Sequence, residues 1–165
     1  MNNACCFTGH RNIRPGDIRQ IEERVRKEVL DLIAEGVSTF YVGGAMGFDT
    51  LAAEVLLDLR EKENAVIRIV SAIPFPDWRD GWPENEKLRQ ERIIQASDEV
   101  FYVARVHSRE AYLRRDREMV DRSGYCIAYC SRASGGTAYT VRYAMKKGLQ
   151  VVNVADWDLG QLSKG

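Results

Sequence analysis

A glycine-rich turn between a strand and a helix constrains this chain more than any other feature. The turn runs from Gly43 to Asp49 as Gly-Gly-Ala-Met-Gly-Phe-Asp. The β-branched and aromatic residues Thr39–Val42 before it predict a buried strand, and apolar residues recur after it at helical spacing. Such a turn lets backbone N–H groups and a helix N-terminus face an anion. The spacing matches neither the dinucleotide fingerprint G-x-G-x-x-G nor a P-loop, and a tight turn without a ligand is the alternative interpretation.

Two further strand ends carry similar polar turns. The segment Ser134-Gly-Gly-Thr137 follows the apolar run of residues 125–130, and Thr8-Gly-His-Arg11 follows residues 4–7. A parallel sheet presents all its carboxyl ends at one edge, and ligands of open α/β sheets bind outside that edge. Three such turns together predict a site for a small molecule that carries phosphate.

Short apolar runs alternate with amphipathic segments along the whole chain. This pattern predicts an α/β fold: a single Rossmann-like domain over residues 1–165, with a mainly parallel sheet and helices on both faces. About six strands are expected. We expect them at residues 4–8, 39–42, 66–70, 100–103, 125–130 and 150–154, with the end of the third at Ile73-Pro-Phe-Pro76. Helices are expected from about residue 17 to Gly36, after Asp49 to about Lys62, over 84–96 and 109–122, and after Thr137. The tail after Trp157 is expected to be peripheral.

Two segments allow two interpretations each. Residues 74–83 contain three prolines together with Trp78 and Trp82, which excludes a regular helix or a central strand. This loop could stack on a nucleobase or form a packed lid without a ligand. The helix over 109–122 alternates arginines with acidic residues, which is typical of a solvated face with local ion pairs. One or two of its arginines could still reach the ligand edge.

Composition limits the partners and the compartment. The 24 basic and 24 acidic residues cancel, so no overall field attracts nucleic acid or an anionic membrane, and we do not expect a nucleic-acid partner. No apolar run approaches the roughly 20 residues of a transmembrane helix, and the N-terminus does not resemble a signal peptide. We therefore expect no membrane insertion and a cytoplasmic protein.

The four cysteines all fall in predicted strands. Cys5 and Cys6 are adjacent and would point to opposite faces of the sheet, while Cys126 and Cys130 would lie about 13 Å apart. Buried cysteines of this kind pack as small apolar side chains. We expect neither a metal site nor a structural disulfide.

The motifs, taken in order, resemble those of the YpsA-like proteins of the SLOG superfamily. That superfamily also contains the DprA DNA-processing proteins and the Lonely Guy phosphoribohydrolases. The resemblance spans residues 6–153 and is carried by Phe7–Arg11, Gly43–Glu54, Ile73-Pro74, Met119–Asp121 with Ser123, and Gly135–Thr137 with Tyr143-Ala144. It implies a Rossmann-like fold and a pocket for a nucleotide or nucleotide-derived ligand, with phosphate near the glycine turns.

The resemblance does not imply a reaction. Lonely Guy enzymes have a catalytic glutamate a few residues after their glycine motif, and residues 134–142 contain no acidic residue. Hydrolysis of an N-glycosidic bond usually needs a carboxylate. Asp49, Glu54, Asp116 or Asp121 could substitute for the missing glutamate. The family also commonly has Arg-Asn where this chain has Arg115-Asp116.

Three functions follow as hypotheses. The first is a sensor or regulatory protein that binds a nucleotide; the second is a nucleotide hydrolase with Asp49 or Asp116 as acid/base; the third, which the charge balance disfavours, is a DprA-like nucleic-acid binder. We assign no catalytic residue and no cofactor, and a homo-oligomer stays open. For the phosphate, Arg11 is preferred to His10 because its fork donates two hydrogen bonds. The expected ligand-binding residues are Thr8, Gly9, His10, Arg11, Gly43, Gly44, Gly47, Asp49, Arg115, Ser134, Gly135, Gly136 and Thr137.

Overall fold

Six parallel strands form one sheet in the order β4-β3-β2-β1-β5-β6. The computed structural model describes residues 3–164. Its strands are β1 (Ala4–Gly9), β2 (Thr39–Val42), β3 (Arg68–Ile73), β4 (Glu99–Tyr102), β5 (Tyr125–Tyr129) and β6 (Gln150–Asn153). The α/β, Rossmann-like prediction is thus confirmed.

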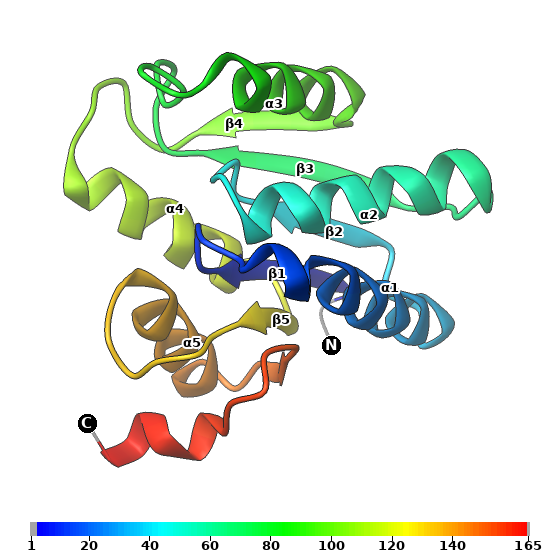
Figure 1. Cartoon of the computed structure of the whole chain (residues 1–165), viewed down its shortest axis with the longest axis vertical. Coiled ribbons are helices and arrows are strands. Elements are labelled where there is room, and N and C mark those ends of the chain that lie inside the picture. Colours follow the sequence, from blue (N-terminus) through cyan, green and yellow to red (C-terminus); the bar gives the residue numbers. More distant parts are fainter. Residues whose placement is uncertain (1–2, 165) are drawn as a thin grey trace.

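Helices cover both faces of the sheet. On one face lie α1 (Ile18–Ala34), α2 (Phe48–Lys62) and α3 (Glu84–Ala96), and α1 and α2 cross in front of the strands in Figure 1. On the other face lie α4 (Arg109–Asp121) and α5 (Gly136–Lys146). Two short 3-10 helices, η1 (Pro15–Asp17) and η2 (Leu159–Lys164), complete the described chain. Among residues 3–164, no helix has both the length and the hydrophobicity needed to cross a membrane.

Alternation along β1 divides the interior into two cores. Cys5 and Phe7 point into the core beneath α1 and α2, whereas Cys6 points into the core beneath α4 and α5. The predicted opposite orientation of Cys5 and Cys6 is therefore confirmed. All four cysteines are buried free thiols, with Cys6 and Cys126 side by side in the β1–β5 register.

The third strand begins later than the sequence suggested and ends where it was expected. The predicted strand begins at Val66 and reaches its end at Ile73-Pro74, whereas β3 is Arg68–Ile73 and Val66 is 90% exposed. Within this strand, Ser71 is a buried polar side chain that shares a hydrogen bond with Ser97 (Oγ–Oγ 2.8 Å). The fourth strand, in contrast, begins one residue earlier than predicted.

The C-terminal segment is packed, which corrects the expectation of a peripheral tail. Leu162 of η2 is buried against α5 in the same core as Cys6. The Arg142 guanidinium donates both to the Leu162 carbonyl (3.3 Å) and to the Ala133 carbonyl (2.8 Å). Figure 1 shows this segment, in red, beside α5. The tail therefore supports the loop that leads from β5 into α5.

The direction in which successive strands are added to the sheet reverses between β1 and β5, although all strands stay parallel. After β1 the chain adds β2, β3 and β4 on one side, and it then returns through α4 to place β5 on the other side of β1. In open α/β sheets, ligands bind outside the strand ends at such a switch point. The ends of β1 and β5 are held together there, where Gly9 pairs with Tyr129 and the His10 N–H donates to the Tyr129 carbonyl (3.3 Å).

Candidate functional site

A cavity of about 360 Å³ opens at the switch point, at the carboxyl ends of β1 and β5. Loops that follow β1, β2 and β5 contribute to its wall, together with the first half of α4 and the first turn of α5. It is lined by Thr8, Gly9, His10, Arg11, Asn12, Ala45, Asp49, Tyr112, Leu113, Arg115, Asp116, Arg132, Gly136 and Thr137.

His10 links the loops that follow β1 and β5. Its side chain is buried, and its Nε2 accepts a hydrogen bond from the Ser131 N–H (2.9 Å). Burial, and then the charge of Arg132, lowers the pKa of His10. The ring is therefore neutral at pH 7, and an accepting Nε2 leaves the proton on Nδ1. In this state His10 joins the two loops and can donate one hydrogen bond from Nδ1.

Two glycines allow the loop after β1 to pack against the start of α2. A Cβ on Gly9 would lie 2.4 Å from the Phe48 ring, and a Cβ on Gly47 would lie 2.1 Å from the backbone oxygen of Arg11. Gly47 also has a φ of +77°, which L side chains rarely adopt. These glycines thus bring two chain segments together, so that Arg11 and Asp49 border the same cavity.

Arg115 is a buried cation in the floor of the cavity. Its Nε donates to Asp116 Oδ1 (2.6 Å), and its Nη1 donates to the carbonyl of Gly43. Burial lowers the pKa of Arg115, but the charges of Asp116 and Asp49 outweigh that effect and raise it above the ordinary value. The guanidinium therefore stays charged. Arg115 is therefore not part of a solvated face of the 109–122 helix; it is one of the arginines of this helix that reach the ligand edge.

Asp49 is a buried acid in the first turn of α2. It is 6% exposed, and its Oδ2 accepts a hydrogen bond from the Ala45 N–H (3.2 Å). Burial raises the pKa of Asp49 to about 7, against the lowering effect of the Arg115 charge. The side chain therefore exchanges its proton near neutral pH.

The N-terminus of α5 is uncapped where it borders the cavity. Gly135, with a φ of +94°, precedes the helix, no side chain caps it, and its first turn contains no acidic residue. Gly136 and Thr137 of this turn line the cavity beside Arg132. Free N–H groups and the helix dipole make such an end a favourable place for an anion.

Eight of the thirteen expected ligand-binding residues line the cavity, and five do not. The eight are Thr8, Gly9, His10, Arg11, Asp49, Arg115, Gly136 and Thr137. Gly43 lies behind the acid and the arginine, since a Cβ there would be 2.7 Å from Asp49 Oδ2 and 3.2 Å from Arg115 Nη1. The other four that do not line it are Gly44, Gly47, Ser134 and Gly135.

The aromatic loop over 74–83 packs as a lid on the protein itself. Trp78 is 6% exposed, and its Nε1 donates to the Gly44 carbonyl (2.9 Å). Trp82 packs against it with ring centroids 6.5 Å apart. Neither tryptophan lines the cavity, and the indole of Trp78 covers Gly44, which favours the packed-lid interpretation.

Several lining residues were not on the expected list. Asn12 and Arg132 lie in loops at predicted strand ends, and this position in the sequence could have identified them as lining residues. Tyr112 and Leu113 had no such signal, because only the fold shows that the start of α4 reaches the switch point. Asp116, which the sequence indicates only as a possible acid/base, also lines the cavity.

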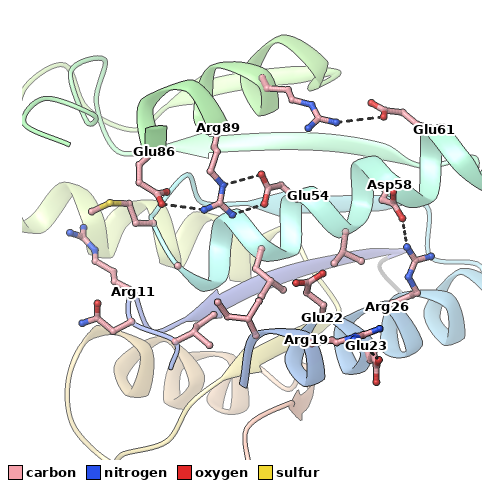
Figure 2. Close-up of a pocket in the computed structure, with 18 of the residues that line it drawn as sticks. Arg11, Arg19, Glu22, Glu23, Arg26, Glu54, Asp58, Glu61, Glu86 and Arg89 are labelled. Atoms are coloured by element: carbon pink, nitrogen blue, oxygen red, sulfur yellow. Dashed lines mark hydrogen bonds and ion pairs between the residues drawn. The ribbon is translucent and has the colours of Figure 1, made fainter. Parts of the chain in front are cut away.

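A larger hollow of about 900 Å³ lies between α1 and α2 and reaches the start of α3 (Figure 2). Most of its charged side chains pair with one another, although Glu86 Oε2 is buried and has no hydrogen-bond partner among the described residues. Arg89 bridges Glu54 (Nη2–Oε1 2.6 Å) and Glu86 (Nη1–Oε1 3.1 Å) above the groove. Arg11 and Asn12 border both hollows. We take the smaller cavity as the candidate site because it lies at the switch point of the sheet and contains the uncapped N-terminus of α5.

Comparison with known proteins places this geometry in a family. The family model of YpsA, described as the YspA SLOG family, matches residues 5–155. The chain belongs to this family. A UPF0398 protein of Halalkalibacterium halodurans is 29% identical over 133 residues, covering 79% of this chain and 70% of that protein. A UPF0398 protein of Bacillus thuringiensis is 24% identical over 141 residues, covering 84% and 76%.

Two solved structures share the fold of this YpsA-family chain. DNA processing protein A from Streptococcus pneumoniae matches 90% of the chain with a TM-score of 0.64 at 18% identity, and the match spans 48% of that protein. DNA processing protein A from Helicobacter pylori matches 90% with a TM-score of 0.59 at 19% identity, over 63% of its length. The latter structure describes a single-stranded DNA binding mode. The resemblance to YpsA-like SLOG proteins is confirmed, and these structures show the shared fold.

Proposed function

We propose that this protein binds a nucleotide in the switch-point cavity, as a sensor or regulatory binding protein. The single observation that carries the proposal is the uncapped, acid-free first turn of α5, which lies beside Arg132 at the ends of β1 and β5. Arg11 lines the same cavity, is exposed, and adds a second cation. Two arginines and a helix N-terminus suit a phosphate group.

The rest of the cavity suits the remainder of a nucleotide. Tyr112 provides an aromatic wall, and Phe75 and His107 hold it with ring centroids 5.4 and 5.9 Å away. A volume of about 360 Å³ is of the size that small-molecule sites have. A ligand of one nucleoside with its phosphate fits these features. Four buried free thiols agree with the cytoplasmic location that we propose.

A second candidate function is hydrolysis of the bound nucleotide, and the buried acid favours it. A group whose pKa lies near the working pH is the most effective general acid or base, and burial raises the pKa of Asp49 to about 7. Asp116 is a weaker candidate because its carboxylate is paired with Arg115. Chromatography of each bound nucleotide after incubation distinguishes the two: released base supports hydrolysis, and unchanged nucleotide supports binding alone.

The binding proposal is tested by replacing Arg11 with alanine. Loss of one charge-assisted hydrogen bond costs about 1.5–3 kcal/mol, so we expect affinity to fall roughly 10- to 150-fold. The melting temperature without ligand should be nearly unchanged, because the Arg11 side chain is exposed. Calorimetry with the best nucleotide from a thermal-shift screen measures the effect. Arg14→Ala is the matched control, since that side chain is 86% exposed and does not line the cavity.

Three results would count against this account. Equal affinities of wild type and Arg11→Ala would remove Arg11 from the site. A screen of mono-, di- and cyclic nucleotides without a hit would contradict the nucleotide proposal itself. Tighter binding of a single-stranded oligonucleotide than of any nucleotide would instead favour a nucleic-acid partner, as the Helicobacter pylori structure describes for that protein.

A further inference from the structure

One carboxyl oxygen in the cavity has hydrogen-bonding capacity that the protein does not use. Asp49 Oδ2 points back to the 43–45 turn, where it accepts from the Ala45 N–H and would lie 2.7 Å from a Cβ on Gly43. Among residues 3–164, no group donates to Asp49 Oδ1, and no cationic nitrogen lies within 4.0 Å of the carboxyl. Oδ1 is thus the oxygen left to the cavity that Asp49 lines.

The neighbouring acid differs in this respect. Asp116 Oδ1 accepts from Arg115 Nε (2.6 Å), and its Oδ2 accepts from the Thr140 hydroxyl (3.1 Å). Both of its oxygens have a donor within the protein. Of the two acids in the floor, Asp49 is the one that needs a donor from a ligand.

We propose that Asp49 Oδ1 accepts hydrogen bonds from the ribose hydroxyls of the bound nucleotide, so that the site selects ribonucleotides over 2′-deoxyribonucleotides. This inference rests on the nucleotide binding proposed above. An ionised carboxylate only accepts hydrogen bonds, and it repels phosphate, which fixes the direction of the ligand. The phosphate lies at α5 and Arg132, and the hydroxyls lie at Asp49.

Position within the cavity favours the sugar over the base as the partner of Asp49. Arg115 and Asp116 occupy the floor beside Asp49, and Asp116 is joined to Thr140 of α5. Asp49 interacts electrostatically with Arg115 and Asp116, and Asp116 is hydrogen-bonded to Thr140 of the helix that receives the phosphate. In a nucleotide the ribose adjoins the phosphate, whereas the base lies beyond it. Tyr112, on α4, offers the base an aromatic surface.

The test compares ribonucleoside and 2′-deoxyribonucleoside 5′-monophosphates of adenine, guanine, cytosine and uracil. Calorimetry at pH 8 measures each pair with wild type, Asp49→Asn and the control Asp80→Asn. Asp80 is an exposed carboxylate of the 74–83 loop and does not line the cavity. For the base that binds best, wild type and Asp80→Asn should prefer the ribonucleotide roughly 10- to 150-fold, as expected for one hydrogen bond to a charged group. In Asp49→Asn the preference should fall to about 2- to 12-fold and well below that of wild type, because the amide oxygen still accepts a hydrogen bond but carries no charge.

The outcomes separate this inference from the function on which it rests. Equal affinity of wild type for both sugars, or a preference that Asp49→Asn retains, overturns the role of Asp49 while nucleotide binding stands. If wild type discriminates between bases instead of sugars, and Asp49→Asn loses this discrimination, the carboxyl contacts the base. This result also overturns the proposed contact between Asp49 and the ribose. Failure of all eight nucleotides to bind overturns this inference, and failure of the mono-, di- and cyclic nucleotides of the screen as well overturns the proposed function. Circular dichroism verifies that each variant is folded.

Discussion

Asp49 is an acid that folding removes from water without giving it an ion pair. Its pKa rises to about 7 in the folded protein, from the ordinary value of 3.8. The folded state therefore holds a proton that the unfolded state releases at lower pH, and this contribution to stability is complete below about pH 4. It is lost progressively as the pH rises to 7, and the ionised acid then destabilises the fold.

This pH dependence of stability leads to a prediction for Asp49→Asn, whose neutral side chain imitates the protonated acid at every pH. Wild type should lose on the order of 2–3 kcal/mol relative to the variant between pH 5 and pH 8, because each unit of difference in pKa is worth about 1.4 kcal/mol. Urea unfolding of both proteins at the two pH values measures the difference, and other titrating groups cancel. If the gap between the two proteins is independent of pH, Asp49 does not titrate in this range.

The position of a residue in the chain explains whether its place in the cavity could be predicted from the sequence. Arg11 lies just after β1 and Asp49 lies at the end of the glycine turn after β2, so their place at the sheet edge followed from the alternation of elements. Tyr112 lies three residues into α4, far from any glycine turn, and its place depends on how α4 crosses the sheet. Burial of Arg115 was not visible either, because its neighbours in sequence look like those of an exposed ion-paired helix.

At the scale of elements, the glycine turn before α2 serves packing. Gly47 is required by its φ of +77° and by the Arg11 backbone oxygen, 2.1 Å from where a Cβ would be. Gly47→Ala should destabilise the protein by about 2–5 kcal/mol, as strain and close packing together do. Gly81→Ala is the matched control, because Gly81 has a φ of +81° but open space around it.

The control isolates the packing contribution. Gly81→Ala should cost only the strain of the left-handed conformation, about 1–2 kcal/mol. Urea unfolding gives both values. Equal costs for the two variants would show that the contact between Gly47 and the Arg11 loop contributes nothing to stability. A larger cost at Gly47 supports the account in which this turn positions Arg11.

Element boundaries followed hydrophobic periodicity except where a polar residue is buried. The helices over 84–96 and 109–122 were predicted to within one residue of α3 and α4. The third strand was predicted to begin two residues early, at the exposed Val66, and it contains the buried Ser71, which shares a hydrogen bond with Ser97. A polar pair of this kind is formed by two segments 26 residues apart, and only the fold shows that they meet.

At the scale of the whole molecule, the parallel sheet was predictable and the strand order was not. Alternating strands and helices imply parallel strands with their carboxyl ends at one edge. They do not say that β5 returns beside β1, and this return creates the switch point and brings Arg132 and Gly136 opposite Arg11. The sequence thus indicated the correct edge of the sheet, whereas the cavity itself depends on the order of the strands.

Backbone NMR during titration with the best-binding nucleotide tests the central claim most directly, because it reports the place of binding. We predict that the largest amide shifts occur at Gly136 and Thr137 of α5 and in residues 8–12, 45–49 and 131–135 around the cavity. Residues 19–26 of α1 and 58–62 of α2, which border only the larger groove, should be little affected. Shifts that centre on that groove and leave Gly136 and Thr137 unchanged would contradict the claim that the nucleotide binds at the switch point.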